Sequence, residues 1–291
     1  MFLDVIFVLT AIFALIFASI ADIKTREIPN WLTYSLITSG LSLRFLYSIT
    51  YNYWGYFLYA ILSLAIFFLL ANIIYYTKQW GGGDAKLMLG LAAMFATSPV
   101  EVSKNIVFSI QLPFLATFFI NLVIIGAIYG LIISAILAIK NKKTFLKELK
   151  ALNEQKQTKL IKKLSLLLAF ILIILISVFI EYAPFKIFAL SLVVIAQFTI
   201  FLYFLIKAVE RACLHKIIAV SELTEGDWVV GIYKNGIYQK QKFEASQKKI
   251  ESIKKQSIEK VKIKNGLPFA PTFLFAFVLT LFYGNLLYLL A

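Results

Sequence analysis

Only four aspartates occur in the 291 residues, and two of them stand where an apolar run meets a short polar loop. Asp22 follows the first apolar run, and Asp84 follows the glycine run Gly81-Gly82-Gly83. An ionisable residue in a membrane span costs about 2.5–3.5 kcal/mol at the bilayer centre and less near the interface, so such residues are often functional. Two neighbouring carboxylates share a proton and act as general base and general acid. Asp22 and Asp84 therefore predict hydrolysis of a peptide bond through an activated water.

The glycine run points to the same use of Asp84. Each glycine costs a helix about 1 kcal/mol relative to alanine, whereas it frees the backbone and lets another chain approach closely. We therefore expect Asp84 on a loop that an extended substrate can reach. Asp84 as the N-cap of the next helix is the alternative reading, and the two roles are compatible.

Other chemistries lack residues to perform them. The chain contains no HExxH, GxSxG or GxxxxGK[ST] motif, which removes support for a metalloprotease, an esterase or a P-loop enzyme. Its single cysteine, Cys213, forms neither an internal disulfide nor a CxxC zinc site. His215 is nearby but lies in a basic segment without a supporting motif, so we expect the surface of a membrane-proximal helix there. We expect no metal and no cofactor.

The elements that must position the two aspartates are membrane helices. The chain is 61% hydrophobic and only 15% charged, and its apolar runs are continuous, which favours helices over an alternating β-barrel. Eight spans are predicted, at about residues 3–21, 31–49, 54–77, 87–103, 112–139, 164–183, 187–206 and 268–290. The fourth is short, because only 14 residues lie between Lys86 and Glu101, a rise of about 21 Å.

Charge distribution sets the expected orientation. With the N-terminus outside, 26 of the 29 Lys and Arg residues fall in cytoplasmic loops, which the positive-inside rule strongly favours. Both Asp22 and Asp84 then face the cytoplasm. The net charge of +14 reflects this topology, so no nucleic-acid partner is expected. The first run has Asp4 and no basic residue before it, the reverse of a signal peptide, so we expect a retained helix.

The fold class predicted is an all-α polytopic membrane bundle of about eight transmembrane helices with a small cytoplasmic α/β insert. The insert has a strong hairpin signal, Asn235-Gly236, followed by a weakly amphipathic helix over about residues 244–260. The lysine-rich loop at residues 141–163 is expected to bind anionic lipid headgroups. The predicted segments are a catalytic core (1–140), a basic cytoplasmic loop (141–163), further membrane helices (164–206), the cytoplasmic insert (207–266) and a C-terminal membrane helix (267–291).

Together these motifs resemble the membrane aspartyl peptidases that process prepilins and preflagellins, of the Gly-x-Gly-Asp type. The residues that carry the resemblance are Asp22, Lys24, Arg26, Ile28, Pro29 and Asn30; Gly81 to Leu87; Leu223 to Trp228; and Gly266 to Phe273. The last two stretches look like archaeal members, whereas residues 141–206 have no counterpart that we recognise.

The resemblance implies that Asp22 and Asp84 are the catalytic pair and cut the short basic leader from type IV pilin-like or flagellin precursors. It also implies no N-methyltransferase activity, because the paired CxxC motifs of many bacterial relatives are missing. Glu27 is the other acid near the pair and is available to hold a basic leader, although a solvated partner for Lys24 or Arg26 is the favoured reading.

Two alternatives remain open at this stage. An intramembrane protease of the presenilin or signal-peptide-peptidase type also uses Gly-x-Gly-Asp, but it has both aspartates well inside spans. A transporter that relays protons or binds a cation through its aspartates would space acids through several spans or use paired broken helices. The later spans lack such acids, since Glu181 and Glu210 lie at or beyond span ends.

Overall fold

The computed structural model describes residues 2–77, 79–99, 112–234, 236–256 and 258–289, and the chain divides into two compact units. The first unit comprises Met1–Gly130 and Gly266–Ala291, and the second comprises Leu131–Asn265. This division does not test the boundaries of the five segments predicted from the sequence, so those boundaries stay predictions. Each unit is described by itself below.

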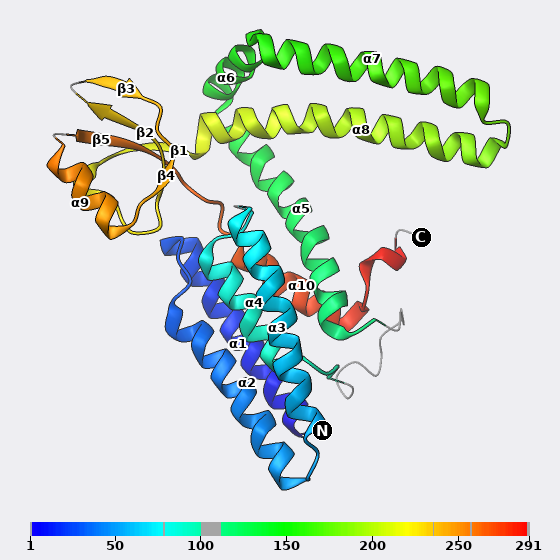
Figure 1. The fold of residues 1–291 in the computed structure, drawn as a ribbon, viewed down its shortest axis with the longest axis vertical. Coiled ribbons are helices and arrows are strands. Elements are labelled where there is room, and N and C mark those ends of the chain that lie inside the picture. Colours follow the sequence, from blue (N-terminus) through cyan, green and yellow to red (C-terminus); the bar gives the residue numbers. More distant parts are fainter. Residues whose placement is uncertain (1, 78, 100–111, 235, 257, 290–291) are drawn as a thin grey trace. The chain divides into compact units, whose positions relative to one another are not determined.

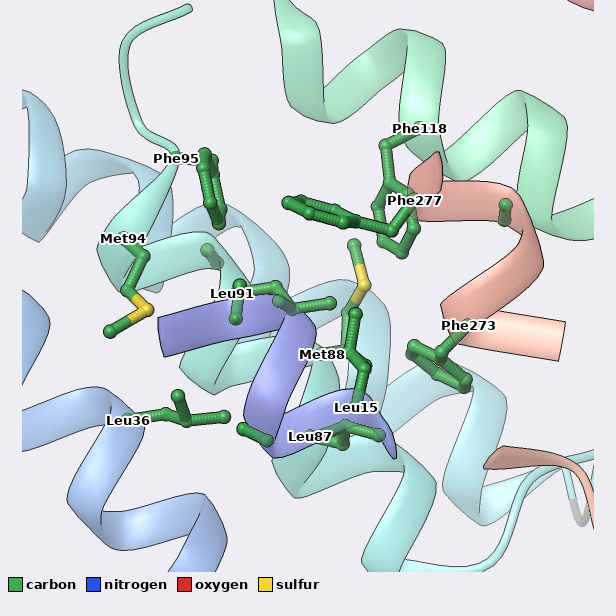
Figure 2. Close-up of a cluster of buried hydrophobic side chains, with 14 of the residues drawn as sticks. Leu15, Leu36, Leu87, Met88, Leu91, Met94, Phe95, Phe118, Phe273 and Phe277 are labelled. Atoms are coloured by element: carbon green, nitrogen blue, oxygen red, sulfur yellow. The ribbon is translucent and has the colours of Figure 1, made fainter. Parts of the chain in front are cut away.

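The first unit is a bundle of helices (Figure 1). Its elements are α1 (Phe2–Thr25), α2 (Asn30–Thr50), α3 (Gly55–Tyr76), α4 (Gly82–Met94), the first part of α5 (Phe114–Lys140), α10 (Ala270–Tyr283) and a 3-10 turn at Leu286–Leu289. Helix α4 lies at the centre, and its buried side chains pack between those of α1, α2, α5 and α10 (Figure 2). Met88 and Leu91 of α4 are completely buried, as are Phe273 and Phe277 of α10.

Glycine allows α4 to approach α2 closely. A Cβ at Gly90 would lie 2.7 Å from Cβ of Leu36, and a Cβ at Gly40 would lie 3.1 Å from the Ala93 backbone. Any larger residue at these two positions would push the helices apart, so their small size fixes the place of α4. Close approach through small residues is a common way of packing helices in membranes.

A buried cation caps the C-terminus of α4. Arg44 of α2 is fully buried and donates hydrogen bonds to the Met94 carbonyl at 2.7 Å and to Thr97 Oγ1 at 3.1 Å. Its guanidinium also lies 4.2 Å from the ring centre of Tyr56. Because the carbonyls at a helix C-terminus carry partial negative charge, the cation stabilises the end of α4.

The second unit joins a helical part to a small antiparallel sheet. Its helices are the end of α5, α6 (Lys142–Glu154), α7 (Lys156–Phe179), α8 (Ala183–Val209), a π-helical turn at Glu210–Leu214, a 3-10 turn at Val220–Glu222 and α9 (Gln247–Lys255). Its strands are β1 (His215–Ala219), β2 (Trp228–Lys234), β3 (Ile237–Gln239), β4 (Phe243–Glu244) and β5 (Ile258–Lys264). The sheet order is β1-β5-β2-β3, with β4 also paired to β2. Every pair is antiparallel.

Two expectations about element boundaries need correction. The basic stretch 141–163 is α6 plus the beginning of α7, so α7 starts earlier than the predicted span. The helix expected to reach residue 260 ends at Lys255, and Ile258 belongs to β5. There Ile258, Val261 and Ile263 bury one face against the sheet core, which outweighs the helical spacing of isoleucines. The hairpin residue Asn235 and the end of the fourth predicted span lie outside the described residues.

The number of spans also differs from the expectation. Five helices in the described residues are long and apolar enough to cross a membrane: Leu3–Thr25, Gly55–Tyr76, Phe114–Lys140, Lys156–Phe179 and Ala183–Leu214. This supports an all-α polytopic membrane protein but does not confirm eight spans. Helix α10 is shorter than its predicted run because the chain turns at Gly284, whose φ is +72°.

Candidate active site

Asp22 lies in the last turn of α1 and is buried, although the residues that follow it are exposed. Helix α1 ends at Thr25, and Arg26 takes a left-handed backbone conformation with φ of 62°, while its N–H donates to the Asp22 carbonyl at 3.0 Å. Pro29, with φ of −60° and ψ of 131°, then starts α2. A sharp reversal between two helices thus holds Asp22 at the helix end.

The Asp22 carboxylate meets the start of α10. Its Oδ2 accepts a hydrogen bond from the Ala270 N–H at 2.8 Å. Arg26 donates from Nη1 to the Gly266 carbonyl at 3.0 Å, which ties the end of α1 to the segment before α10. A carboxylate at a helix N-terminus is stabilised by unpaired N–H groups and by the helix dipole.

Asp84 lies in the first turn of α4, outside the five spanning helices, and is half-buried. Its Oδ2 accepts a hydrogen bond from the Gly81 N–H at 3.2 Å, so Asp84 is the third residue of the helix and bonds back to the N-cap, Gly81. The expectations that Asp84 lies on a loop or is itself the N-cap therefore need correction, because the helix already begins within the glycine run. Burial and the charge of Asp22 raise the pKa of Asp84 to about 7. The carboxylates of Asp22 and Asp84 are therefore close enough to interact electrostatically.

Two further contacts join the aspartate-bearing motifs. A Cβ at Gly83 would lie 3.0 Å from Cβ of Ile28, so the glycine run packs directly on the loop after α1. Lys86 Nζ donates to Asn30 Oδ1 at 2.7 Å and connects the first turns of α4 and α2. The two aspartate-bearing motifs that carry the family resemblance in the first unit are thus in contact.

An aromatic cluster anchors the glycine run to α10. The Trp80 ring lies 6.0 Å from the Phe269 ring, 5.5 Å from the Phe273 ring and 6.2 Å from the Phe119 ring, measured between centroids. Since Trp80 directly precedes Gly81, its packing fixes the entrance to the run. Neither Trp80 nor the Ala270 amide was singled out as a site group from the sequence. The available signal was the Gly266 to Phe273 stretch, which matched archaeal relatives.

The remaining candidates lie away from this site or do not add to it. Glu27 is exposed. Asp227 belongs to the second unit, where its Oδ2 accepts hydrogen bonds from the Thr224 N–H and hydroxyl at 2.8 and 2.9 Å, which explains it as a turn residue. Cys213 has its Sγ 3.6 Å from the Leu137 carbonyl. Within the described ranges, no group of three or more His, Cys, Asp or Glu residues could hold a metal ion.

Comparison with known proteins adds independent support for this reading of the first unit. Residues 9–134 match the model of the type IV leader peptidase family, a range that contains Asp22 and Asp84. The chain is 26% identical over 204 residues to prepilin peptidase EppA of Methanothermobacter thermautotrophicus, a match that covers 68% of this chain and 52% of that protein. The chain thus spans about half the length of this curated relative. No solved structure matches. The resemblance to prepilin peptidases predicted from the sequence is confirmed.

Proposed function

We propose that this protein, whose residues 9–134 match the type IV leader peptidase family, is a membrane aspartyl endopeptidase. It removes the short basic leader from type IV prepilin-like or preflagellin-like precursors. The observation that supports the proposal is the packing of the glycine run before Asp84 on Ile28, in the loop that follows Asp22, while burial and the charge of Asp22 raise the pKa of Asp84 to about 7. A pair with one proton between two carboxylates is what water-mediated peptide hydrolysis requires.

The positions of the aspartates fit cleavage at a membrane surface. Asp22 lies at one end of a spanning helix, and Asp84 begins a helix of 13 residues. A pilin-like precursor has its scissile bond where a polar leader joins a hydrophobic helix, so a site at the edge of the membrane meets that bond. Aspartates at helix ends do not favour a presenilin-type protease, and Glu181 and Glu210 give no chain of acids for a transporter.

The site faces the cytoplasm in this proposal, because 26 of the 29 basic residues lie in loops on that side. Lys240 tests the orientation, since it is exposed in the second unit. A Lys240→Cys variant in a Cys213→Ser background should react with a membrane-impermeant maleimide only after the cells are opened. Labelling of intact cells would reverse the orientation.

Cleavage itself is tested in proteoliposomes with a leader-bearing precursor. The unaltered protein should shorten the precursor, while Asp22→Asn and Asp84→Asn should each lower the rate about a thousandfold or more, since general acid–base catalysis contributes up to about 10⁴-fold. Asp227→Asn is the matched control and should cleave normally. Full activity in either Asp22→Asn or Asp84→Asn would falsify the proposed pair.

The absence of methyltransferase activity is part of the same proposal. It rests on the single cysteine, which leaves no paired CxxC motifs in the chain. Mass spectrometry of the cleaved product should find a free amino terminus when a methyl donor is supplied. A methylated product formed by the purified protein would contradict this part and leave the peptidase assignment intact.

A further inference from the structure

The two carboxylates of the site have unequal surroundings. Asp22 accepts a hydrogen bond from the backbone N–H of Ala270, the first residue of α10, at 2.8 Å. Arg26 follows Asp22 by about one helical turn and donates to the Gly266 carbonyl at 3.0 Å, which places its cation at the same junction between α1 and the segment before α10. Hydrogen bonds from N–H groups, a helix N-terminus and a nearby cation all favour a carboxylate over a carboxylic acid.

Asp84 also lies in the first turn of a helix, α4, but its other surroundings give weaker support for a negative charge. Its recorded hydrogen bond comes from the Gly81 N–H at the longer distance of 3.2 Å. The charge acting on it is that of Asp22, which has the same sign. The cation nearest in sequence, Lys86, has its ammonium 2.7 Å from the Asn30 side-chain oxygen. Removing a proton from Asp84 is therefore costly while Asp22 is ionised.

We infer that Asp22 is the general base and Asp84 the general acid of the resting site, a division of roles set by the first turn of α10 and by Arg26. This inference rests on the proposed peptidase function for its meaning. Burial and the charge of Asp22, which raise the pKa of Asp84 to about 7, agree with the division.

The division fixes the order of proton transfers in hydrolysis. Asp22 takes a proton from water as the water oxygen bonds to the scissile carbonyl carbon, and Asp84 gives its proton to the carbonyl oxygen. In the second step the carbon–nitrogen bond breaks. Asp22 then returns its proton to the leaving nitrogen, while Asp84 takes one from a hydroxyl of the intermediate. One water is consumed, and both side chains regain their starting states.

The first turn of α10 and Arg26 act through Asp22, so they are positioning groups in this scheme. Helix α10 is separated from α1 by more than 240 residues in the chain, yet its Ala270 amide contacts the Asp22 carboxylate. Its Phe269 ring packs on Trp80, which precedes the glycine run of Asp84. The N-terminal end of α10 therefore contacts Asp22 directly and also contacts the residue that precedes the glycine run of Asp84.

Infrared titration without substrate tests the location of the proton. The unaltered protein should show a carboxylic acid carbonyl band that disappears as the pH rises through the neutral range. Asp84→Asn should remove this band. Asp22→Asn should retain it with a lower midpoint, because burial remains the larger cause and the neighbouring charge is gone.

Three results would overturn the inference. The first is a carboxylic acid band that persists in Asp84→Asn and vanishes in Asp22→Asn. The second is a band that is lost equally in both variants. The third is the absence of any such band in the neutral pH range of the unaltered protein. Because no substrate is present, these outcomes are independent of the peptidase assay. A failed cleavage assay would refute the proposed function and leave the proton assignment standing.

Arg26 offers a second test, because its left-handed backbone suits asparagine. Arg26→Asn removes the charge without added strain, and Arg26→Lys keeps it. The other titratable groups that act here are Asp22, Asp84 and Tyr129 of α5. Arg26→Asn should move the acidic limb of the kcat/KM profile to higher pH, whereas Arg26→Lys should restore it. An unchanged profile in Arg26→Asn would remove Arg26 from the scheme.

Discussion

The bundle around α4 and the α7–α8 pair are both built from strongly apolar helices, but they use their side chains in opposite ways. Of the most apolar 18-residue stretch of α1 in the first unit, 39% is buried inside the protein. The corresponding share for α7 of the second unit is 6%. Apolar character alone therefore does not mark a core in a membrane protein, since lipid accepts the same side chains. What distinguishes the bundle is glycine at close contacts and polar groups at helix ends.

The largest predicted effect is a loss of folding stability when a side chain in the core of the first unit is truncated. Phe277 of α10 is completely buried, whereas Phe170 of α7 is 62% exposed. Phe277→Ala should lower the free energy of unfolding by about 3–5 kcal/mol, because it leaves a cavity among packed rings. Phe170→Ala should have an effect within about 0.5 kcal/mol. Denaturant unfolding in detergent micelles measures both, and equal losses would show that α7 is buried too.

Glycine at the contact between the two motifs is the next feature to test. Gly83→Val forces side-chain atoms into Ile28 and should displace Asp84 from its partner, which lowers cleavage about a hundredfold. Gly130→Val is the matched control, because a Cβ at Gly130 meets nothing within 4 Å. Comparable rates in the two variants would mean that the contact with Ile28 does not position the site.

The protonation state of Asp84 should change kcat/KM for leader cleavage by about tenfold per pH unit. Since the acid must be protonated and its pKa is about 7, the protonated fraction falls as pH rises above that value. The kcat/KM for leader cleavage should therefore decline about tenfold per unit on the alkaline side. A rate that stays flat up to about pH 9 would contradict the raised pKa.

The smallest effect is expected at a surface ion pair of the second unit. Lys264 Nζ lies 3.0 Å from Glu210 Oε1, and their side chains are 42% and 34% exposed. Lys264→Gln should change the unfolding free energy by about 0–1 kcal/mol and leave cleavage unaltered. A large loss of cleavage would instead connect this unit to catalysis.

The sequence was most informative about local features of the site. The three glycines indicated the start of α4, because a helix start depends on neighbouring residues, although Gly81 is the N-cap and Asp84 is the third residue of the helix. Fold class followed from continuous apolar runs, although run length overestimated α10, which ends at a turn that hydropathy does not record.

Contacts between distant segments were not predictable from one sequence. The hydrogen bond from Ala270 to Asp22 joins residues 248 positions apart, and nothing in either local pattern specifies it. The packing of Trp80 on Phe273 is similar, because an aromatic residue at a span end usually indicates an interface anchor. The start of β5 was misread because Ile258 fits a helical spacing with Ile250 and Ile253 until the sheet partners are known.

The most direct test of the central claim, that Asp22 and Asp84 form one catalytic pair, is the single-turnover cleavage rate of Asp22→Asn, Asp84→Asn and the double variant. Residues that act as a unit lose their function together, so their losses do not add in free energy. The double variant should be about as slow as the slower single variant. Losses that multiply in the double variant would mean that the two aspartates act separately, and would contradict the account.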